Sequence, residues 1–395
     1  MVHSSSRRSF LGATLALPAA AAASTGSGSP GQAPAAKSPA PPAAPKFTYA
    51  TLGKTGVRLT RLSFGCMTTS DQSVIERAAD MGIVYFDTAR VYQGGNNERM
   101  VGAALKKYRS KAFIASKSLA RDGKGALADL DASLKELQTD HLDLWYLHSR
   151  QAPNTVTDDL LEAQNAAKKD GKIRFAGVSF HGGHAEMIPA MLKTNHFDVF
   201  LMSYNFTMDP SIEPLIETAH KANVGIVAMK GLAGGVKPTV GSYRIPAEQL
   251  NKLTREGAPV AALKWVLKNP NVDTVIPSIV DNEQLEQNIA AMSSPFSQND
   301  AKLLAMRLEE IKPLYCRMCG HCEGQCPKGL PASDILRFLM YAEGYGQFAM
   351  GRESFQGLPA EVAAVRCGDC ASCSIQCPNG VQVASRLRRA QELFA

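Results

Sequence analysis

Short apolar segments alternate with amphipathic segments along most of this chain. Eight of the apolar segments have the length and composition of buried strands, and between them lie stretches in which apolar residues recur at helical spacing. The predicted strands are 61–67, 84–89, 112–117, 141–148, 174–180, 198–204, 225–230 and 273–278. The predicted helices are 97–108, 126–137, 158–172, 212–223 and 258–269. Eight strands alternating with helices over about 250 residues predict an α/β fold, a (β/α)8 TIM barrel, although a doubly wound open sheet gives similar local signals.

The first 45 residues lack this alternation. Arg7 and Arg8 precede an apolar, alanine-rich run at 12–23, and no acidic residue occurs before Asp71. This order predicts a signal peptide with a twin-arginine motif, and therefore a periplasmic or otherwise exported protein, whereas the plainer alternative is a disordered alanine-rich tail. Ser, Gly, Pro and Ala dominate 24–45, which is typical of a linker. We therefore divide the chain into signal and linker (1–45), barrel (46–312) and a C-terminal domain (313–395).

The composition narrows the class of protein. The chain has 395 residues, of which 45% are hydrophobic and 20% charged, so it can bury a large core. Its net charge of +7 comes from 43 basic and 36 acidic residues that form no long basic run, so nucleic acid is not an expected partner. The apolar run at 12–23 is too short to span a membrane comfortably, and no spanning segment is expected apart from the signal.

Polar residues stand where several predicted strands end. Asp87, Lys117 and His148 close the second, third and fourth strands, and Tyr92 follows in the loop after the second. In a TIM barrel these positions meet at the catalytic mouth. A tyrosine is a poor proton donor at neutral pH unless a cation lowers its pKa, and an aspartate would hold such a lysine charged. Each residue alone has an ordinary structural explanation, but four at successive strand ends predict an acid site.

Eight of the nine cysteines lie in the last eighty residues and form two copies of one motif. Each copy has the spacing C-x2-C-x2-C-x3-C-P, which is typical of bacterial ferredoxins with two [4Fe-4S] clusters. The copies are Cys316, Cys319, Cys322 and Cys326, then Cys367, Cys370, Cys373 and Cys377. Zinc or disulfides are the alternatives. Helix-period segments between the motifs predict a helical two-cluster, ferredoxin-like domain.

A proline follows each fourth cysteine and would turn the chain toward the neighbouring cluster. We therefore predict that Cys377 completes the cluster of the first motif and that Cys326 completes that of the second. The remaining cysteine, Cys66, is expected to be a small buried hydrophobic residue rather than a ligand.

Residues 47–308 resemble the aldo-keto reductase family. The resemblance rests on "LGKTGVRLTRLSFG" (52–65), "FDTARVYQGGNNE" (86–98), Ser116-Lys117 and "DLWYLH" ending at His148. It implies a (β/α)8 barrel that moves a hydride between a nicotinamide and a carbonyl. By resemblance Tyr92 would be the general acid, Lys117 would lower its pKa, Asp87 would pair with Lys117, and His148 would orient the carbonyl.

The same resemblance implies a nucleotide site that this chain matches only in part. Ser179 and Tyr204 stand at positions that hold the nicotinamide amide in the family, but Phe180 and Leu201 replace its Asn and Gln. In the adenine segment, Ser278 and Asn288 are expected at the site. A glycine-containing loop could bring its backbone amides to the pyrophosphate, and its expected residues are Lys230, Gly231, Leu232 and Gly234. Ser278, Gln284 and Asp281 offer no cation to a 2′-phosphate, so NAD(H) is favoured over NADP(H).

Together these features predict an exported oxidoreductase. It would act on a small carbonyl or alcohol substrate, use a nicotinamide, and exchange electrons with a redox partner protein through its clusters. The alternative is a non-catalytic barrel, or an electron carrier or redox sensor whose clusters are structural or dock a partner. The complete set of four polar residues favours the enzyme, whereas Phe180 and Leu201 favour the alternative.

Overall fold

The structure is a computed structural model that describes residues 47–234, 239–240, 243–244, 256–368 and 370–394. The predicted signal and linker (1–45) lie outside the described residues, the first of which is Phe47. In the part of the chain described, no helix combines the length and the apolar character needed to cross a bilayer.

Eight parallel strands form the central sheet, which confirms the predicted barrel. The strands are β3 (Phe64–Gly65), β4 (Tyr85–Asp87), β5 (Phe113–Ser118), β6 (Leu142–Leu147), β7 (Ile173–Phe180), β8 (Val199–Ser203), β9 (Gly225–Met229) and β12 (Thr274–Val275). Each pairs with its neighbour in chain order, and isolated parallel bridges of Leu62 with Val275 and of Gly65 with Ser278 join the first strand to the last. The amides of Ser63 and Gly65 donate to the carbonyls of Val275 and Pro277, both at 2.9 Å. These bonds close the sheet.

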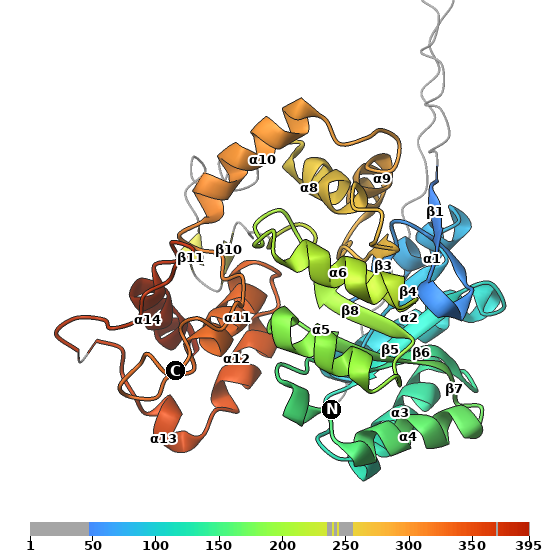
Figure 1. Cartoon of the computed structure of the whole chain (residues 1–395), viewed down its shortest axis with the longest axis horizontal. Helices are drawn as coiled ribbons and strands as arrows, with labels where there is room; N and C mark the ends of the chain where they lie inside the picture. Colours follow the sequence, from blue (N-terminus) through green and yellow to red (C-terminus); the bar gives the residue numbers. More distant parts are fainter. Residues whose placement is uncertain (1–46, 235–238, 241–242, 245–255, 369, 395) are drawn as a thin grey trace, which may run out of the picture. The chain divides into compact units, whose positions relative to one another are not determined.

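Helices follow the strands around the outside of the barrel (Figure 1). They are α1 (Gln72–Asp80), α2 (Asn96–Leu105), α3 (Gly123–Leu137), α4 (Asp158–Lys169), α5 (His184–Lys193), α6 (Ile212–Lys221), α8 (Ala258–Leu267), α9 (Asn282–Ala290) and α10 (Gln298–Ile311). Short 3-10 helices occupy Gly53–Thr55, Tyr92–Gly95, Lys106–Tyr108 and Pro153–Thr155. Two small hairpins, β1 (Tyr49–Thr51) with β2 (Arg58–Thr60) and β10 (Thr239–Val240) with β11 (Tyr243–Arg244), lie outside the central sheet.

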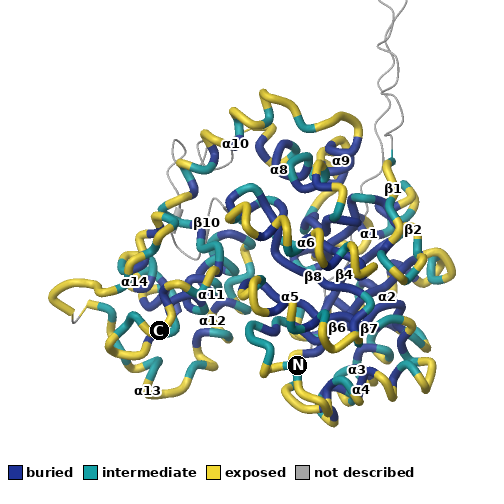
Figure 2. Tube along the Cα trace, in the orientation of Figure 1, coloured by how far each residue is buried: buried dark blue, intermediate teal, exposed yellow. Residues whose placement is uncertain are grey.

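The barrel strands are buried on both faces, as Figure 2 shows for β4, β6, β7 and β8. Side chains of a strand alternate between its two faces, and β6 illustrates the result. Trp145 and Leu147 pack outward against the helices, whereas Leu144 and Tyr146 fill the barrel interior. Because both faces need apolar residues, the strand is a continuous apolar run rather than an alternating one.

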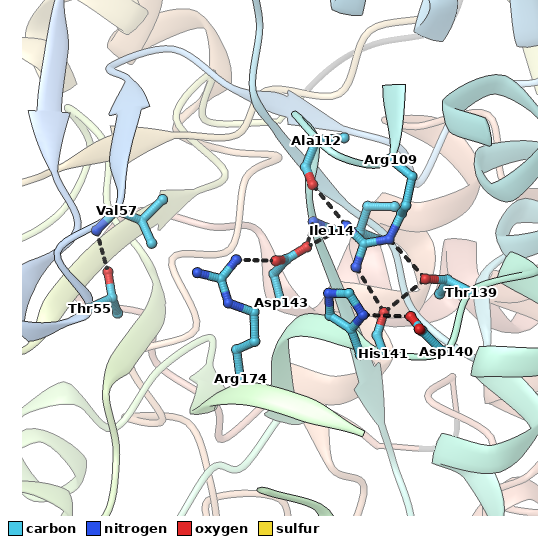
Figure 3. A network of polar contacts seen from close by, with 10 residues as sticks. All are labelled: Thr55, Val57, Arg109, Ala112, Ile114, Thr139, Asp140, His141, Asp143 and Arg174. Atoms are coloured by element: carbon cyan, nitrogen blue, oxygen red, sulfur yellow. Dashed lines mark hydrogen bonds and ion pairs between the residues drawn. The ribbon is translucent and has the colours of Figure 1, made fainter. Parts of the chain in front are cut away.

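Asp143, at the start of β6, organises a charged network among the barrel strands (Figure 3). Its carboxylate accepts hydrogen bonds from Arg109 at 3.0 Å, from Arg174 at 2.6 Å and from the amide of Ile114 at 2.9 Å. The Asp143 side chain is only 3% exposed. The network lies at the amino ends of the strands, opposite the mouth, where TIM barrels keep residues that serve stability.

We expect Asp143→Ala to lower the free energy of unfolding by about 3–5 kcal/mol, because it leaves buried donors without their acceptor. Chemical denaturation followed by circular dichroism measures the change. Asp131→Ala is the matched control, since the Asp131 carboxylate is 60% exposed and pairs with Lys172 on the surface. An exposed pair is worth about 1 kcal/mol or less. Equal losses in the two variants would contradict the structural role of Asp143.

The C-terminal region is helical, as predicted. Its helices are α11 (Ala332–Glu343), α12 (Phe348–Gln356), α13 (Ala360–Ala363) and α14 (Val383–Phe394). Leu336, Leu339, Phe355, Leu387 and Phe394 form a core of their own, and Glu343 of α11 pairs with two arginines of α14. The barrel and this region belong to one compact unit. The domain boundary at 312–313 therefore stays a prediction.

Candidate active site

The four predicted acid-site residues meet at the mouth of the barrel. Asp87 is the last residue of β4, Lys117 lies near the end of β5, His148 directly follows β6, and Tyr92 begins a 3-10 helix. The ammonium of Lys117 donates to the Asp87 carboxylate at 2.5 Å and to the Thr88 carbonyl at 2.6 Å. It lies 3.5 Å from the Tyr92 hydroxyl. The rings of Tyr92 and His148 meet edge to face, with centroids 6.0 Å apart.

Burial controls the protonation of these groups. Burial raises the pKa of Tyr92 well above its ordinary value, and the Asp87 charge adds to the shift. This differs from the expectation that Lys117 lowers that pKa, because the cost of charging an enclosed phenol outweighs the nearby cation. Burial also raises the pKa of Asp87, against the opposing effect of Lys117. Burial and the charge of Lys117 lower the pKa of His148 well below its ordinary value. At neutral pH the site therefore presents a protonated phenol and a neutral imidazole.

A cavity of about 690 Å³ opens at this mouth and extends along the barrel rim. It is lined by the four acid-site residues and by most of the residues predicted for the nucleotide, namely Ser179, Lys230, Gly231, Leu232, Gly234, Ser278 and Asn288. Gln284 and Gln287 line it as well. One continuous space thus joins the predicted adenine segment to the acid site.

Tyr204 is the exception among the predicted nucleotide residues, because the described residues that line the cavity do not include it. Its ring is fully buried and packs on Trp265, with centroids 4.9 Å apart. Its hydroxyl donates to Glu213 and accepts from Asn269, both at 3.0 Å. These contacts hold the ring in the packed interior, so the described geometry does not support a nicotinamide contact by Tyr204, and that role stays a prediction.

Several cavity residues were missed by the sequence reasoning. His181 directly follows β7, so the rule that strand ends reach the mouth could have identified it. Arg307 of α10 also lines the cavity and is a cation that the argument against NADP(H) did not include. Arg337, Tyr341 and Tyr345 come from the region of α11. Nothing in their local sequence indicates that tertiary packing brings them to the barrel.

The loop of the first cysteine motif lies directly on the barrel mouth. The backbone at Met318 comes so close to Gly182 that a Cβ there would lie 2.0 Å from the Met318 carbonyl oxygen. The Lys230 ammonium lies 3.6 Å from the Met318 sulfur, and Asn205 donates to the Tyr315 hydroxyl at 3.2 Å. Only glycine admits this approach, so Gly182 allows the motif to contact the active site.

All nine cysteines lie in the described part of the chain, and each is free. Within that part, no group of three or more His, Cys, Asp or Glu side chains converges closely enough to hold a metal ion. Cys66 is fully buried in the barrel core, as predicted.

The two cysteine motifs nevertheless lie against each other. Gln325 of the first accepts hydrogen bonds from Ser374 and from the amide of Gln376, at 2.7 and 2.8 Å. Asn379, just after the last cysteine, donates to the Cys319 sulfur at 3.5 Å.

The thiols also act on one another in two groups. Burial raises the pKa of Cys322, and Cys319 and Cys377 raise it further. Burial likewise raises the pKa of Cys367, and the neighbouring thiols of Cys373, Cys326 and Cys370 raise it further. The fourth cysteine of each motif thus neighbours the other motif.

A closed (β/α)8 barrel with Asp, Tyr, Lys and His side chains at its mouth defines the chain as a barrel oxidoreductase. The model of the aldo/keto reductase family matches residues 61–306, and the chain belongs to this family.

Comparison with known proteins gives relatives of the same class. An uncharacterized oxidoreductase of Bacillus subtilis is 28% identical over 66% of this chain and 94% of its own. The L-glyceraldehyde 3-phosphate reductase of Escherichia coli K12 is 26% identical over 63% and 88%. Among solved structures, the thermostable aldo-keto reductase Tm1743 is 27% identical, with a TM-score of 0.52 over 66% of this chain and 99% of that one. The holo form of an aldo-keto reductase from Bacillus halodurans has a TM-score of 0.55 and shares the fold.

Proposed function

We propose that this protein is an exported, nicotinamide-dependent reductase of small carbonyl compounds, or dehydrogenase of the corresponding alcohols. The observation that carries the proposal is the contact of Lys117 with both Asp87 and Tyr92, beside His148, in a cavity shared with the predicted nucleotide residues. Two [4Fe-4S] clusters in the C-terminal region would exchange electrons with a redox partner protein.

The described residues suit a nicotinamide nucleotide. Lys230, Gly231, Leu232 and Gly234 of the glycine-containing loop line the cavity, and the backbone has positive φ at Lys230, Ala233 and Gly234, a conformation typical of loops whose amides bind a pyrophosphate. Asn288 and Ser278 line the same cavity toward α9. A bound nicotinamide supplies or accepts the hydride at the substrate carbon.

The chain's own residues would handle the proton and the oxygen. Tyr92 donates its phenolic proton to the carbonyl oxygen as the hydride reaches the carbon, so the carbonyl becomes an alcohol and Tyr92 a phenolate. The Lys117 ammonium, 3.5 Å away, stabilises that phenolate. Asp87 keeps Lys117 positioned. Neutral His148 can donate a hydrogen bond to the same carbonyl oxygen and orient it. A proton from solvent then restores Tyr92.

The cysteines suit two cubane clusters by their motif spacing and by their neighbours. The first cluster would be held by Cys316, Cys319, Cys322 and Cys377, and the second by Cys367, Cys370, Cys373 and Cys326. The Met318 amide donates to the Cys316 sulfur at 3.3 Å, a type of contact that tunes cluster potentials. Cys370 and Cys373 are exposed, which would let a partner protein approach the second cluster.

Nucleotide preference tests the proposal directly. We expect the anaerobically purified chain to bind NAD(H) at least as tightly as NADP(H), because Ser278 and Gln284 are uncharged and Gln284 bonds the Val280 amide at 3.2 Å. Calorimetry with both nucleotides measures the difference. A clear preference for NADP(H) would contradict the expectation, and its loss in Arg307→Met would identify Arg307 as the phosphate contact. Absence of binding by either nucleotide would overturn the proposed function.

Export rests on Arg7 and Arg8 in the N-terminal segment, and on the clusters, since the twin-arginine route carries proteins that are already folded around their cofactors. We expect replacement of both arginines by lysine to leave the folded protein in the cytoplasm, as judged by cell fractionation. Replacement of Lys37 and Lys46 by arginine is the control, because it changes the same types of residue outside the motif. Unchanged export of the Lys-Lys variant would exclude this route.

A further inference from the structure

Three basic side chains beside the acid site line the cavity, and each keeps at least one nitrogen without a strong acceptor. The Nδ1 atom of His181 and the Nε atom of Arg337 are buried and have no hydrogen-bond partner among the described residues. The Lys230 ammonium contacts the Met318 sulfur at 3.6 Å, and a thioether is a weak acceptor. All three residues line the cavity.

Arg337 has only part of its charge compensated. Its Nη2 donates to Asp334 at 3.0 Å, on the same helix, and its Nη1 reaches the Ser149 hydroxyl at the long distance of 3.4 Å. The Arg337 side chain is 13% exposed, so solvent does little to replace a missing acceptor. His148, Ser149 and Arg337 line the same cavity, so the guanidinium and the imidazole that would orient the carbonyl border one space.

Burial and the charge of Arg337 act on the other two groups. The pKa of Lys230 is lowered to about 7, first by burial and then by the Arg337 charge, with Cys316 opposing. Burial lowers the pKa of His181 well below its ordinary value, and Lys230 and Arg337 lower it further.

The acidic residues that line the cavity in the described structure are Asp87 and Glu353. Neither is among the charges that shift the pKa values of His148, His181 or Lys230. The counter-charge that the structure supplies to this group of basic residues is therefore the Asp334 carboxylate, which pairs with one edge of Arg337.

Enclosing the charges of Lys230 and Arg337 together is costly unless an anion joins them, and the buried Nδ1 atom of His181 also needs a hydrogen-bond partner. We propose that His181, Lys230 and Arg337 bind a carboxylate of the substrate, so that the preferred substrates are carbonyl compounds that also carry a carboxylate. This inference rests on the proposed function, because it specifies the substrate of that site. Three donor groups match the two oxygens of a carboxylate, and the open edge of Arg337 meets it with a charge-assisted hydrogen bond.

The first test compares 4-carboxybenzaldehyde with its methyl ester, which differs by the loss of the charge. We expect kcat/KM to favour the acid by roughly 10- to 100-fold, the worth of one or two charge-assisted hydrogen bonds. Arg337→Met should reduce this ratio by roughly tenfold or more, and Arg337→Lys should restore part of it. Arg352→Met is the matched control, since Arg352 is exposed on the neighbouring helix α12 and should leave the ratio unchanged.

A ratio near one in the wild type, with both compounds reduced, would overturn the carboxylate site while the reductase stands. An unchanged ratio in Arg337→Met would overturn it as well. The ratio of kcat/KM for glyceraldehyde 3-phosphate to that for glyceraldehyde is a further check. A value larger than the acid-to-ester ratio would assign the site to a phosphate and overturn the carboxylate proposal.

The second test needs no turnover. Calorimetry on the full chain with its clusters measures binding of 4-(hydroxymethyl)benzoate and of its methyl ester, with and without saturating NAD(H). We expect the acid to bind more tightly than the ester by roughly tenfold, with nucleotide present as well as absent. Binding of the acid that disappears when NAD(H) is added would assign the cations to the nucleotide pyrophosphate and overturn the proposal. Equal binding of acid and ester would overturn it too. Because binding is measured without turnover, the difference between acid and ester tests the carboxylate site even if the protein reduces no aldehyde.

Discussion

The Tyr92→Phe variant should lose carbonyl reduction by roughly 10²- to 10⁴-fold in kcat, the usual contribution of a positioned proton donor. Nucleotide binding should be largely unchanged, because only one hydroxyl is removed and the ring still packs against His148. The measurement is steady-state turnover of an aldehyde beside calorimetry with the nucleotide. A fall in kcat with a constant nucleotide Kd would separate the loss of a proton donor from the loss of a binding site.

Tyr49→Phe is the matched control, since Tyr49 is 42% exposed in the hairpin outside the central sheet and should keep full activity. Equal activity of wild type and Tyr92→Phe on every carbonyl tried would remove the reductase assignment. Lys117→Met is a less clean probe, because it also leaves the buried Asp87 without its cation. The double variant Asp87→Asn/Lys117→Met avoids that unpaired charge and should lower kcat while the barrel stays folded.

The second large effect concerns the cysteines. We expect about eight iron atoms per chain in protein purified without oxygen, four for each cluster. Cys326→Ala should lose about half of the iron, and the electron paramagnetic resonance spectrum of its remaining cluster should match that of Cys367→Ala rather than that of Cys316→Ala. The reason is that Cys326 neighbours Cys367, which belongs to the other motif.

Cys66→Ala is the control for this series, because Cys66 is buried in the barrel core and should leave the iron content unchanged. Zinc in place of iron, or about four iron atoms in the wild type, would exclude the two-cluster arrangement. A spectrum of Cys326→Ala that matches Cys316→Ala would retain two clusters but remove the crossing.

The barrel could be predicted from sequence because its strands are buried on both faces and therefore form unbroken apolar runs. Asp87, Lys117 and His148 could be placed at the mouth by the same reasoning, since the carboxyl ends of parallel strands meet at one edge. These predictions depend on local patterns that survive in a single sequence.

Other features required contacts that no local pattern encodes. Tyr204 occupies a strand end, yet Trp265, 61 positions later, fixes its ring elsewhere. Arg337 is a charged residue in the middle of the amphipathic helix α11, so its sequence alone favours the surface, and only the docking of that helix brings it to the cavity. The pKa of Tyr92 was expected to fall because a cation was foreseen and the extent of burial was not.

Because α11 lines the cavity, the smallest active form of this protein must include the C-terminal region as well as the barrel. Arg337, Phe338, Tyr341 and Tyr345 form part of the wall around the acid site, although they follow the barrel in sequence. A chain truncated after residue 312 would therefore be an incomplete enzyme with an open side, not a simpler reductase that has lost an accessory. Engineering that treats the two regions as interchangeable modules would dismantle the active site.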